Sequence, residues 1–467
     1  MLAFSDLPFE LLSVILQFVI RPSHLAALCL VNTSFRDLAV PLLYESAYVY
    51  PWHNEAKAKV VQLFRTLRDS PDLARYVRKL VIKDFPKALS TAQLEDTWSI
   101  CSAGLKNCVN LVHCTWTRDG SLNDAILEAL LCCQTLRELE INGHHDSQYD
   151  PRLLCRFTKL DKITLIMPSG LVIDHLPFWI KETGKSLRYL SLICKARLAS
   201  PLVNDLLLKT LAPNLHALEE LSLLGCPRVT QDGILAVLSE NKGEIHGLGL
   251  EGLSPSFDIV KFSSARQTST ALSHLRSLTM TVQRPLEIWT RSVLQLLENV
   301  PLEFFQVYSP GGADVSILPD DFCAQLVSGH GVRLRRFSVH RMRIGFGAVE
   351  NICNGCPNLE QLFVVMRREE MKALGPVLAK ARKLRSVHIN FPLDAATSVT
   401  IKDIMADVQT IIRACPETSI TQFGCNTRVW QVERVVLRDE GGDLTTETQL
   451  VRYERPEVPE QFLVLRA

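Results

Sequence analysis

The chain has 467 residues, of which 47% are hydrophobic and 22% are charged, and its formal net charge is +1 at pH 7. This length and apolar content allow one large core or two or three domains, and they exclude a mainly disordered protein. The balanced charge gives no indication of nucleic acid or an acidic membrane surface as a partner. The 14 cysteines are too widely spread for the disulfide framework of a short secreted domain.

Targeting signals are also missing from the sequence pattern. No stretch combines the basic region, the apolar segment and the cleavage site of a signal peptide, and none offers about 18 uncharged apolar residues for a membrane span. We therefore expect a cytoplasmic and/or nuclear protein with no membrane contact. The sequon Asn32-Thr33-Ser34 is expected to be unmodified there.

The first 44 residues predict three short helices. Asp6 or Ser5 can cap the first helix, and Pro8 suits its first turn because the missing N–H costs nothing there. Ser23 is expected to cap a second helix that runs to residue 40, and Pro41 is expected to break the chain again.

The first helix, in the stretch DLPFELLSVILQFV, is apolar on more than one side. One helical stripe contains Leu11, Leu12, Ile15, Leu16 and Val19, and the apolar residues outside it are Leu7, Phe9, Val14 and Phe18. Three short helices bury little surface by themselves. The remaining apolar face must therefore pack either on the rest of this chain or on another protein.

The spacing of these residues resembles an F-box, and the tail VPLLYESAYV is similar to fungal F-boxes in particular. The run that carries the resemblance is Leu7-Pro8-x-Glu10-Leu11-Leu12-x-x-Ile15-Leu16, then Leu25-x-x-Leu28-x-x-Val31-x-x-x-Phe35-Arg36-x-Leu38-Ala39, then Leu42-x-Tyr44. The resemblance implies binding to the adaptor of an SCF-type cullin–RING ubiquitin ligase and, through it, to the cullin. The residues implied in adaptor binding are Leu7, Pro8, Leu11, Leu12, Ile15, Leu16 and Leu28.

From residue 77 onward one pattern returns every 24 to 36 residues: apolar, two variable, apolar, one variable, apolar. It begins at Val77, Leu111, Leu136, Leu160, Leu187, Leu218, Ile245, Leu275, Leu302, Leu334, Leu359, Leu384 and, more weakly, Ile420. The last two apolar positions predict a strand, and helical stretches of about ten residues return the chain to the next strand. This alternation is typical of leucine-rich repeats, which stack into a solenoid of parallel strands and return helices.

The fold class predicted is therefore α/β: a short N-terminal helical F-box followed by an irregular leucine-rich-repeat solenoid. Only LEELSLLGCPRVTQDGILAVLSE, with Cys226 at the Asn/Cys position, closely resembles the usual repeat, so we expect an irregular horseshoe. Strand-like segments on either side of Gly441-Gly442 predict a hairpin that caps the solenoid. The expected domains are an F-box at 1–48, a helical linker at 49–76, the solenoid at 77–425, and a hairpin with a tail at 426–467.

Several motifs suggest other chemistry, but their contexts do not fit. Gly247-x-Gly249-x-x-Gly252 matches a dinucleotide fingerprint, yet its first two glycines fall inside a repeat strand rather than in a strand-to-helix turn. Cys353-x-x-Cys356 lacks the second pair that a structural zinc site needs, and we expect buried packing. His144-His145-Asp146 is expected to be an exposed loop. No catalytic motif is recognisable, so we expect no metal, no cofactor and no catalytic residue.

Basic residues outnumber acidic ones between Arg333 and Arg385, and some fall at variable strand positions. Arginines there can hold carboxylates or a phosphorylated segment, and aromatic residues can anchor a partner. The candidate substrate-binding residues are Arg335, Arg336, Arg385, Tyr189, Phe304 and Phe363. The alternative, an ordinary solvated charged face, stays open.

Together these features predict a non-catalytic substrate receptor of the ligase, which would hold an unknown protein target. Two alternatives stay open. The chain could be an interaction scaffold without ubiquitination, or an enzyme on an unrecognised α/β fold, which would need a deep polar pocket.

Overall fold

The computed structural model describes residues 8–19, 21–53, 55–86, 90–145, 147–194, 202–310, 317–391, 400–438 and 444–453. The chain divides into two compact units. Within the described residues, the first unit contains 8–218 and Glu240–Lys242, and the second contains Glu219–Ser239 and 243–453.

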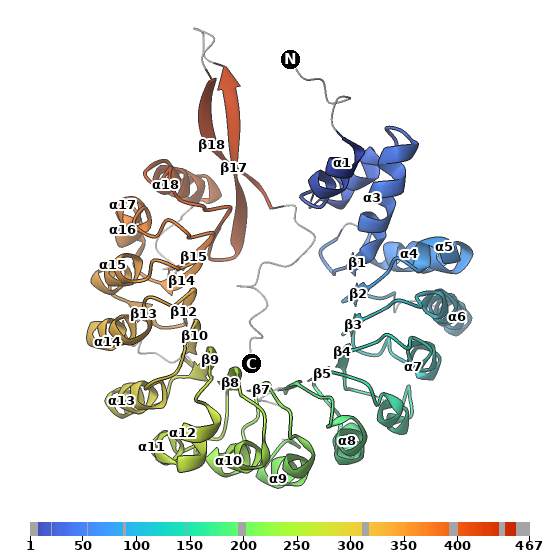
Figure 1. Cartoon of the computed structure of the whole chain (residues 1–467), viewed down its shortest axis with the longest axis horizontal. Helices are drawn as coiled ribbons and strands as arrows, with labels where there is room; N and C mark the ends of the chain where they lie inside the picture. Colours follow the sequence, from blue (N-terminus) through green and yellow to red (C-terminus); the bar gives the residue numbers. More distant parts are fainter. Residues whose placement is uncertain are drawn as a thin grey trace. The chain divides into compact units, whose positions relative to one another are not determined.

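The first unit opens with three helices: α1 (Phe9–Leu16), α2 (Pro22–Leu28) and α3 (Thr33–Glu45) (Figure 1). The single second helix expected over 23–40 is wrong, because Asn32 starts a new helix there: its side chain accepts a hydrogen bond of 2.9 Å from the Phe35 amide. The residue that precedes α2 is Arg21, not Ser23. The candidate caps Asp6 and Ser5 lie outside the described residues.

Pro41 lies inside α3, so the expected chain break at this residue is also wrong. A proline removes one intrahelical hydrogen bond. The helix continues because Leu42 and Leu43, in its next turn, pack against the apolar core of the three helices. Burial of these two side chains offsets the lost bond.

A parallel sheet follows directly in the first unit, with strands in chain order from β1 to β6. The strands are β1 (Ser46–Val49), β2 (Lys79–Ile82), β3 (His113–Trp116), β4 (Glu138–Asn142), β5 (Lys162–Ile166) and β6 (Tyr189–Ile193). The connecting helices are α4 (Ala56–Asp69), α5 (Pro71–Ala74), α6 (Thr91–Asn107), α7 (Asp124–Leu131), η2 (Pro151–Arg156), α8 (Gly170–Thr183), α9 (Asp205–Leu211) and η3 (Ala212–Asn214). The sheet begins at Ser46, earlier than residue 77, where the repeats were expected to begin.

The second unit contains the remaining repeats and ends in an antiparallel hairpin. Its parallel strands are β7 (Glu220–Leu224), β8 (Gly247–Glu251), β9 (Ser277–Thr281), β10 (Phe304–Tyr308), β12 (Arg336–His340), β14 (Gln361–Val365), β15 (Ser386–Asn390) and β16 (Gln422–Cys425), beside the small pair β11 (Ile317–Leu318) and β13 (Arg343–Ile344). The hairpin consists of β17 (Arg428–Arg438) and β18 (Leu444–Arg452). Its turn at Gly441-Gly442 lies outside the described residues.

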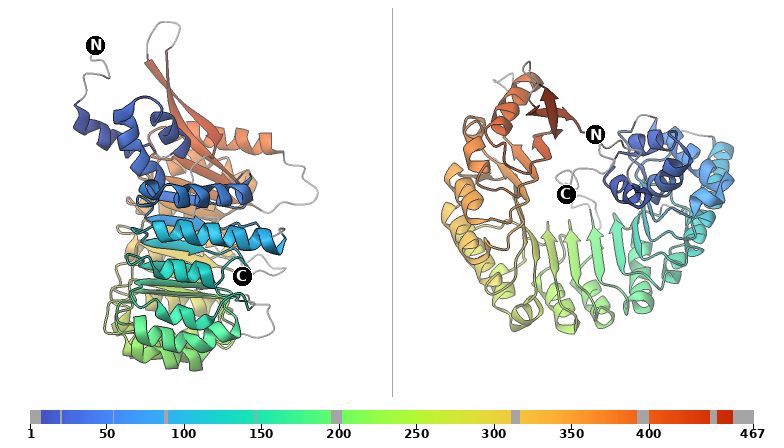
Figure 2. Two further views of the ribbon diagram at one scale, coloured as in Figure 1. Left: turned by 90° about the vertical axis from the view of Figure 1, so that its right-hand side faces the viewer. Right: turned by 45° about the horizontal axis from the view of Figure 1, so that its top comes forward.

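Helices cover one face of the strands in the second unit (Figure 2). They are α10 (Gln231–Glu240), α11 (Ile259–Ser264), α12 (Arg266–Ala271), α13 (Leu286–Leu296), α14 (Asp320–His330), α15 (Phe346–Gly355), α16 (Arg368–Met371), α17 (Leu374–Leu378) and α18 (Ile401–Arg413). We call the opposite face of the sheet the inner face.

Each strand predicted from the repeat pattern is present and begins two residues after the first apolar position. Phe305 on β10 points to the helices, where its ring lies 5.9 Å from that of Phe322 on α14. Because strand side chains alternate between faces, Phe304 and Gln306 belong to the inner face. The α/β class with leucine-rich-type strand–helix repeats is therefore confirmed. The domain boundaries given above stay a prediction.

Candidate protein-interaction surfaces

The three N-terminal helices share a small apolar core. Leu16, Leu25 and Ala39 are buried at its centre. Partly buried side chains surround them: Val19, Leu28, Cys29, Phe35, Leu38, Leu42 and Leu43. The second half of α1 thus uses one side to hold the module together.

The other side of α1 is apolar and exposed. The exposed fractions are 46% for Leu11, 49% for Val14, 41% for Ile15 and 79% for Phe18. We call these four residues the α1 flank. Contiguous exposed apolar surface on a soluble domain is typical of a protein-interaction site.

The residues implied in adaptor binding therefore divide into three groups. Leu7 lies outside the described residues. Pro8, Leu11 and Ile15 are exposed and available to a partner, whereas Leu12 and Leu16 are buried, with 8% and 3% exposed, and support the helix from beneath. Leu28 is half-buried in the module core. Sequence reasoning did not assign Val14 and Phe18 to the surface, although their positions outside the main stripe indicated it.

Acidic residues from neighbouring repeats pair with part of the basic segment. Arg335 lies 2.9 Å from the Glu360 carboxylate and 3.6 Å from that of Glu303, which in turn lies 3.6 Å from Arg276. Backbone hydrogen bonds place Arg276, Glu303, Arg335, Glu360 and Arg385 in one row across adjacent strands. The bond to Glu360 raises the pKa of Arg335. We call these five residues the charged row.

Arg385 ends the charged row and is the member best placed for a partner. It is exposed, and its guanidinium makes no hydrogen bond or ion pair with the described part of the chain. Elsewhere in the basic segment Arg368 pairs with Asp407 at 2.7 Å. Carboxylates therefore match only part of the positive charge of this segment, namely that of Arg335, Arg368, Lys372 and Lys380 among the described residues.

Beside the charged row, Arg336 lies between two aromatic rings of the inner face. Its guanidinium lies 5.5 Å from the centre of the Phe304 ring and 6.0 Å from that of Phe363, and it donates to the Gln361 amide oxygen. Burial lowers the pKa of Arg336. Phe304 is half-buried and Phe363 is buried, so Phe304 offers more surface to a partner.

Two buried histidines complete this part of the inner face. The His340 ring and the Ser338 hydroxyl share a hydrogen bond of 2.7 Å. The rings of His388 and Phe363 are nearly perpendicular, with their centroids 6.4 Å apart. Burial lowers the pKa of each histidine to about 4. Both imidazoles are neutral at physiological pH and serve as polar packing. No local sequence pattern distinguishes them from exposed histidines.

Tyr189 does not belong to this cluster. It lies on β6 in the first unit, half-buried, with the Lys162 ammonium 5.8 Å from its ring centre. The six candidates for target binding therefore occupy both units, and the second unit brings together Phe304, Arg335, Arg336, Phe363 and, at the end of the charged row, Arg385.

The first two glycines of the motif lie within a strand, as the sequence indicated, and Gly252 follows that strand. Gly247 and Gly249 are part of β8, and a Cβ on each would stand 2.7 Å from Glu220 Cγ and 2.6 Å from Ser222 Oγ. The glycines thus make room for side chains of the neighbouring strand β7.

The cysteine and histidine motifs engage other partners. Cys353 and Cys356 are buried, which raises the pKa of each thiol to about 12. His144 bonds Asp119 and His145 bonds Ser169, each at 2.8 Å, while Asp146 lies outside the described residues.

Within the described ranges no group of three or more His, Cys, Asp or Glu side chains is arranged to hold a metal ion. None of the helices described is both long and apolar enough to cross a membrane.

Comparison with known proteins adds little beyond the fold. No protein-family model and no curated protein matches the chain. Among solved structures, the Rad7–Elc1 complex in yeast is similar at 15% identity with a TM-score of 0.40, covering 74% of this chain and 92% of that one. The leucine-rich repeat-containing protein LegL7 from Legionella pneumophila follows at 10% identity and a TM-score of 0.34, covering 72% and 92%. A leucine-rich repeat protein from Bacteroides thetaiotaomicron has 9% identity and a TM-score of 0.26, covering 84% and 52%.

Proposed function

We propose that this protein is the substrate-recognition subunit of an SCF-type cullin–RING ubiquitin ligase. The observation that carries the proposal is the exposed α1 flank on a three-helix module whose spacing resembles an F-box. The first helices would dock on the adaptor, and the adaptor would connect the chain to the cullin. The repeats would hold a target protein.

The energetics favour a protein partner for the α1 flank. Burying apolar surface stabilises an interface by roughly 25 cal/mol per Å². The flank presents three large side chains on adjacent turns of α1 and Phe18 in the turn that follows the helix, which suits insertion into a groove of a second protein. Leu16 anchors the helix in the module core and Leu12 is also buried, so the surface is preformed and little ordering cost opposes binding.

Target recognition would use the inner face of the second unit. Arg385 offers an exposed cation for a carboxylate or a phosphorylated side chain, and Phe304 offers a half-buried ring as an apolar anchor. Arg335 and Arg336 would shape this surface rather than bind directly, since their guanidinium groups are engaged by Glu360 and Gln361. Phe363 would support Phe304 through the shared contact with Arg336.

In this role the chain would position the target protein, and other subunits would carry out the transfer of ubiquitin. Holding a target lysine near a ubiquitin-charged enzyme raises the effective concentration of the reacting groups. The protein would need no metal, cofactor or nucleophile, and it would act in the cytoplasm and/or the nucleus, where such ligases assemble.

The test is affinity purification from cells in which the proteasome is blocked, comparing the intact chain with Ile15→Asp. We expect the intact chain to retain the adaptor, the cullin and ubiquitin-modified targets, and Ile15→Asp to lose the adaptor and the cullin. The matched control is Leu206→Asp on α9, which is 73% exposed and outside the module. Retention of targets without any box-dependent ubiquitin modification would identify a scaffold and refute the ligase role.

A further inference from the structure

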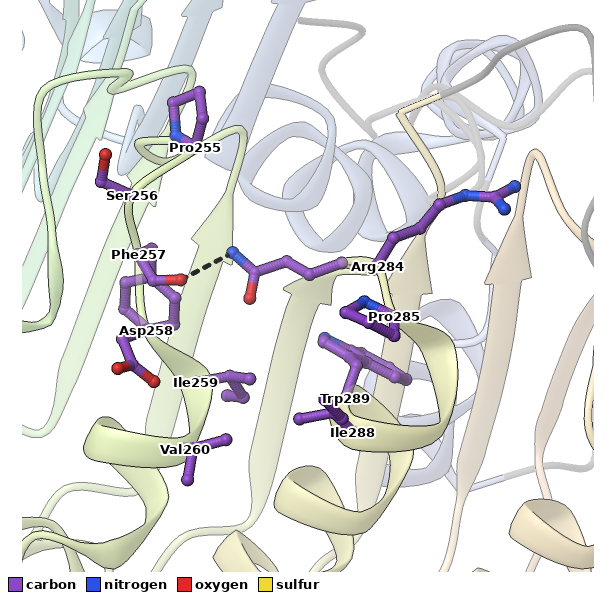
Figure 3. A pocket seen from close by; sticks show the side chains of 11 residues that line it. Pro255, Ser256, Phe257, Asp258, Ile259, Val260, Arg284, Pro285, Ile288 and Trp289 are labelled. Carbon is purple, nitrogen blue, oxygen red and sulfur yellow. Dashed lines mark hydrogen bonds between the residues drawn. The ribbon is translucent and has the colours of Figure 1, made fainter.

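A pocket of about 290 Å³ lies in the second unit between two loops that each lead from a strand into a helix. The first loop follows β8 and enters α11, and the second follows β9 and enters α13 (Figure 3). The pocket is separate from the charged row and from the α1 flank. Nothing in the proposed function uses it.

The pocket is lined by both apolar and polar residues, and hydrogen bonds hold its two loops in place. Phe257 and Ile259 line one wall and are buried, while Ile288 stands at the opposite rim and is exposed. The Gln283 side-chain amide joins the two loops, because it donates a hydrogen bond of 3.1 Å to the Phe257 carbonyl; this bond is the dashed line in Figure 3. The Asp258 amide donates a hydrogen bond of 2.9 Å to the side-chain oxygen of Gln231, and this bond holds the first loop against α10. The pocket is therefore preformed.

Trp289 lines the pocket from within and carries an unused donor. Its side chain is 1% exposed, and its Nε1 has no hydrogen-bond partner among the described residues. Figure 3 shows the nitrogen-bearing edge of the indole turned toward the loop that carries Phe257 and Ile259. The ring itself is held by Phe322, with centroids 6.0 Å apart. A buried donor left without an acceptor is energetically unfavourable, so an acceptor placed there by a ligand would be stabilised.

The charge around the pocket favours an anionic ligand. Arg284 is exposed and makes no ion pair or hydrogen bond with any residue that the structure describes. Helix α13 begins beside it with Pro285 at the N-cap position and no side-chain cap. As in any α-helix, its first-turn amides have no intrahelical acceptor. The acidic residue of that turn, Glu287, is exposed and does not line the pocket. The one acidic residue in the lining, Asp258, already accepts a hydrogen bond of 2.9 Å from the Lys261 amide.

We propose that this pocket binds an extended peptide segment of a partner protein in which a large apolar side chain stands next to an acidic residue. The apolar side chain fills the space between Phe257 and Ile288. A main-chain carbonyl of the peptide accepts the hydrogen bond from Trp289 Nε1. The neighbouring carboxylate pairs with Arg284, whose exposed side chain can turn over the mouth of the pocket, and with the open amides at the start of α13.

The test measures binding of four fluorescein-labelled peptides to the full-length chain by fluorescence anisotropy. The peptides are GSLEGS, GSLQGS, GSLKGS and GSAEGS. Protein is titrated up to about 1 mM, so that weak binding of a single short motif is still detected. We expect GSLEGS to bind at least tenfold more tightly than GSLKGS and GSAEGS. Arg284→Glu should reverse the order of GSLEGS and GSLKGS. The control Arg291→Glu removes an exposed arginine of the same helix outside the pocket and should preserve the order.

A second variant addresses the indole donor. Trp289→Phe should weaken GSLEGS binding about tenfold while the preference for acid over lysine remains. Equal affinity for GSLEGS and GSLKGS, absence of binding to all four peptides, or the same behaviour of Arg284→Glu and the intact chain would overturn the proposal. Competition by free N-acetylglutamate at the same concentration as GSLEGS would also overturn it, in favour of a small-acid site. Adaptor binding plays no part in this assay, so its outcome is independent of the ligase proposal.

Discussion

Arg335 and Glu360 form an ion pair across two neighbouring strands, with 2.9 Å between Nη2 and Oε1. The two residues stand at the same position of consecutive repeats, one residue before β12 and one before β14. Glu303, at that position of the preceding repeat, contacts the other amino group of Arg335 at 3.6 Å. Repetition of one backbone geometry thus brings alternating charges into line, and the partners of Arg335 come from the repeats on either side of it.

The charged row should contribute little to stability. Arg335 and Glu360 are partly exposed, so water and salt screen their attraction. Arg335→Ala should lower the free energy of unfolding by less than about 1 kcal/mol, and 0.5 M salt should reduce the difference further. Urea unfolding at low and high salt measures this. A loss of several kcal/mol that salt does not change would show that the row is a structural core element.

His340 and His388 should make the second unit sensitive to acid. Each titrates near its usual value in the unfolded chain but only near pH 4 when folded, because burial lowers the pKa. Between these values the unfolded chain binds more protons, so stability is complete above about pH 6.5 and is lost as the pH falls toward 4. The loss is on the order of 3 kcal/mol for each histidine at most.

Urea unfolding at pH 7.5, 5.5 and 4.5 measures this effect, and His388→Gln separates it from the titration of carboxylates. The variant should lose less stability than the intact chain between pH 6.5 and pH 4. An identical pH dependence of the two proteins would mean that His388 is already charged in the folded state.

Glu251 should make the protein less stable as the pH rises, which is the opposite of the effect of the two histidines. It is buried on β8, and burial raises its pKa to about 7. The folded protein therefore holds a proton that the unfolded chain has released, and stability present below about pH 4.5 is lost as the pH rises through 7. Glu251→Gln keeps the shape without the charge, and it should stabilise the protein at pH 8 by on the order of 2–3 kcal/mol. Thermal unfolding at pH 5 and pH 8 measures this; equal melting temperatures of variant and intact chain at pH 8 would contradict it.

Asn32 should hold the start of α3. Its side chain caps the Phe35 amide, and loss of such a cap costs about 1 kcal/mol. Asn32→Ala should therefore speed hydrogen exchange of the amides in the first turn of α3 roughly fivefold, while exchange in the repeat sheets is unchanged. Asn32→Asp, which keeps the acceptor, is the control. Unchanged exchange in Asn32→Ala would show that the cap is dispensable.

The strands could be predicted from the sequence because each repeat buries the same three apolar positions. In the repeat at Leu302, for example, Leu302, Phe305 and Val307 are all fully buried. Helices were harder to predict. The helix α8 has Pro177 in its interior, a residue that normally argues against a helix. In α6 the apolar residues are not gathered on one face, although Ser90 and Gln93 form a capping box at the start of the helix.

The surfaces depend on contacts that no local pattern contains. The acidic partners of Arg335 come from two other repeats: Glu303 lies 32 residues before it and Glu360 lies 25 residues after it in the sequence. The same holds for the pocket, where the unused donor of Trp289 is visible only once Phe322 and the two loops are in place. The apolar excess of α1 could be predicted because it is local, but which of its leucines are buried depends on α2 and α3.

The account depends most on the α1 flank, and calorimetric titration of the purified SCF adaptor into the full-length chain tests it most directly. The intact chain and Leu206→Asp are predicted to bind with the same affinity. Leu11→Asp and Ile15→Asp are predicted to weaken binding at least a hundredfold, which corresponds to about 2.8 kcal/mol, with unchanged circular dichroism. Adaptor binding that is absent from the intact chain, or equally strong in all four proteins, would contradict the account.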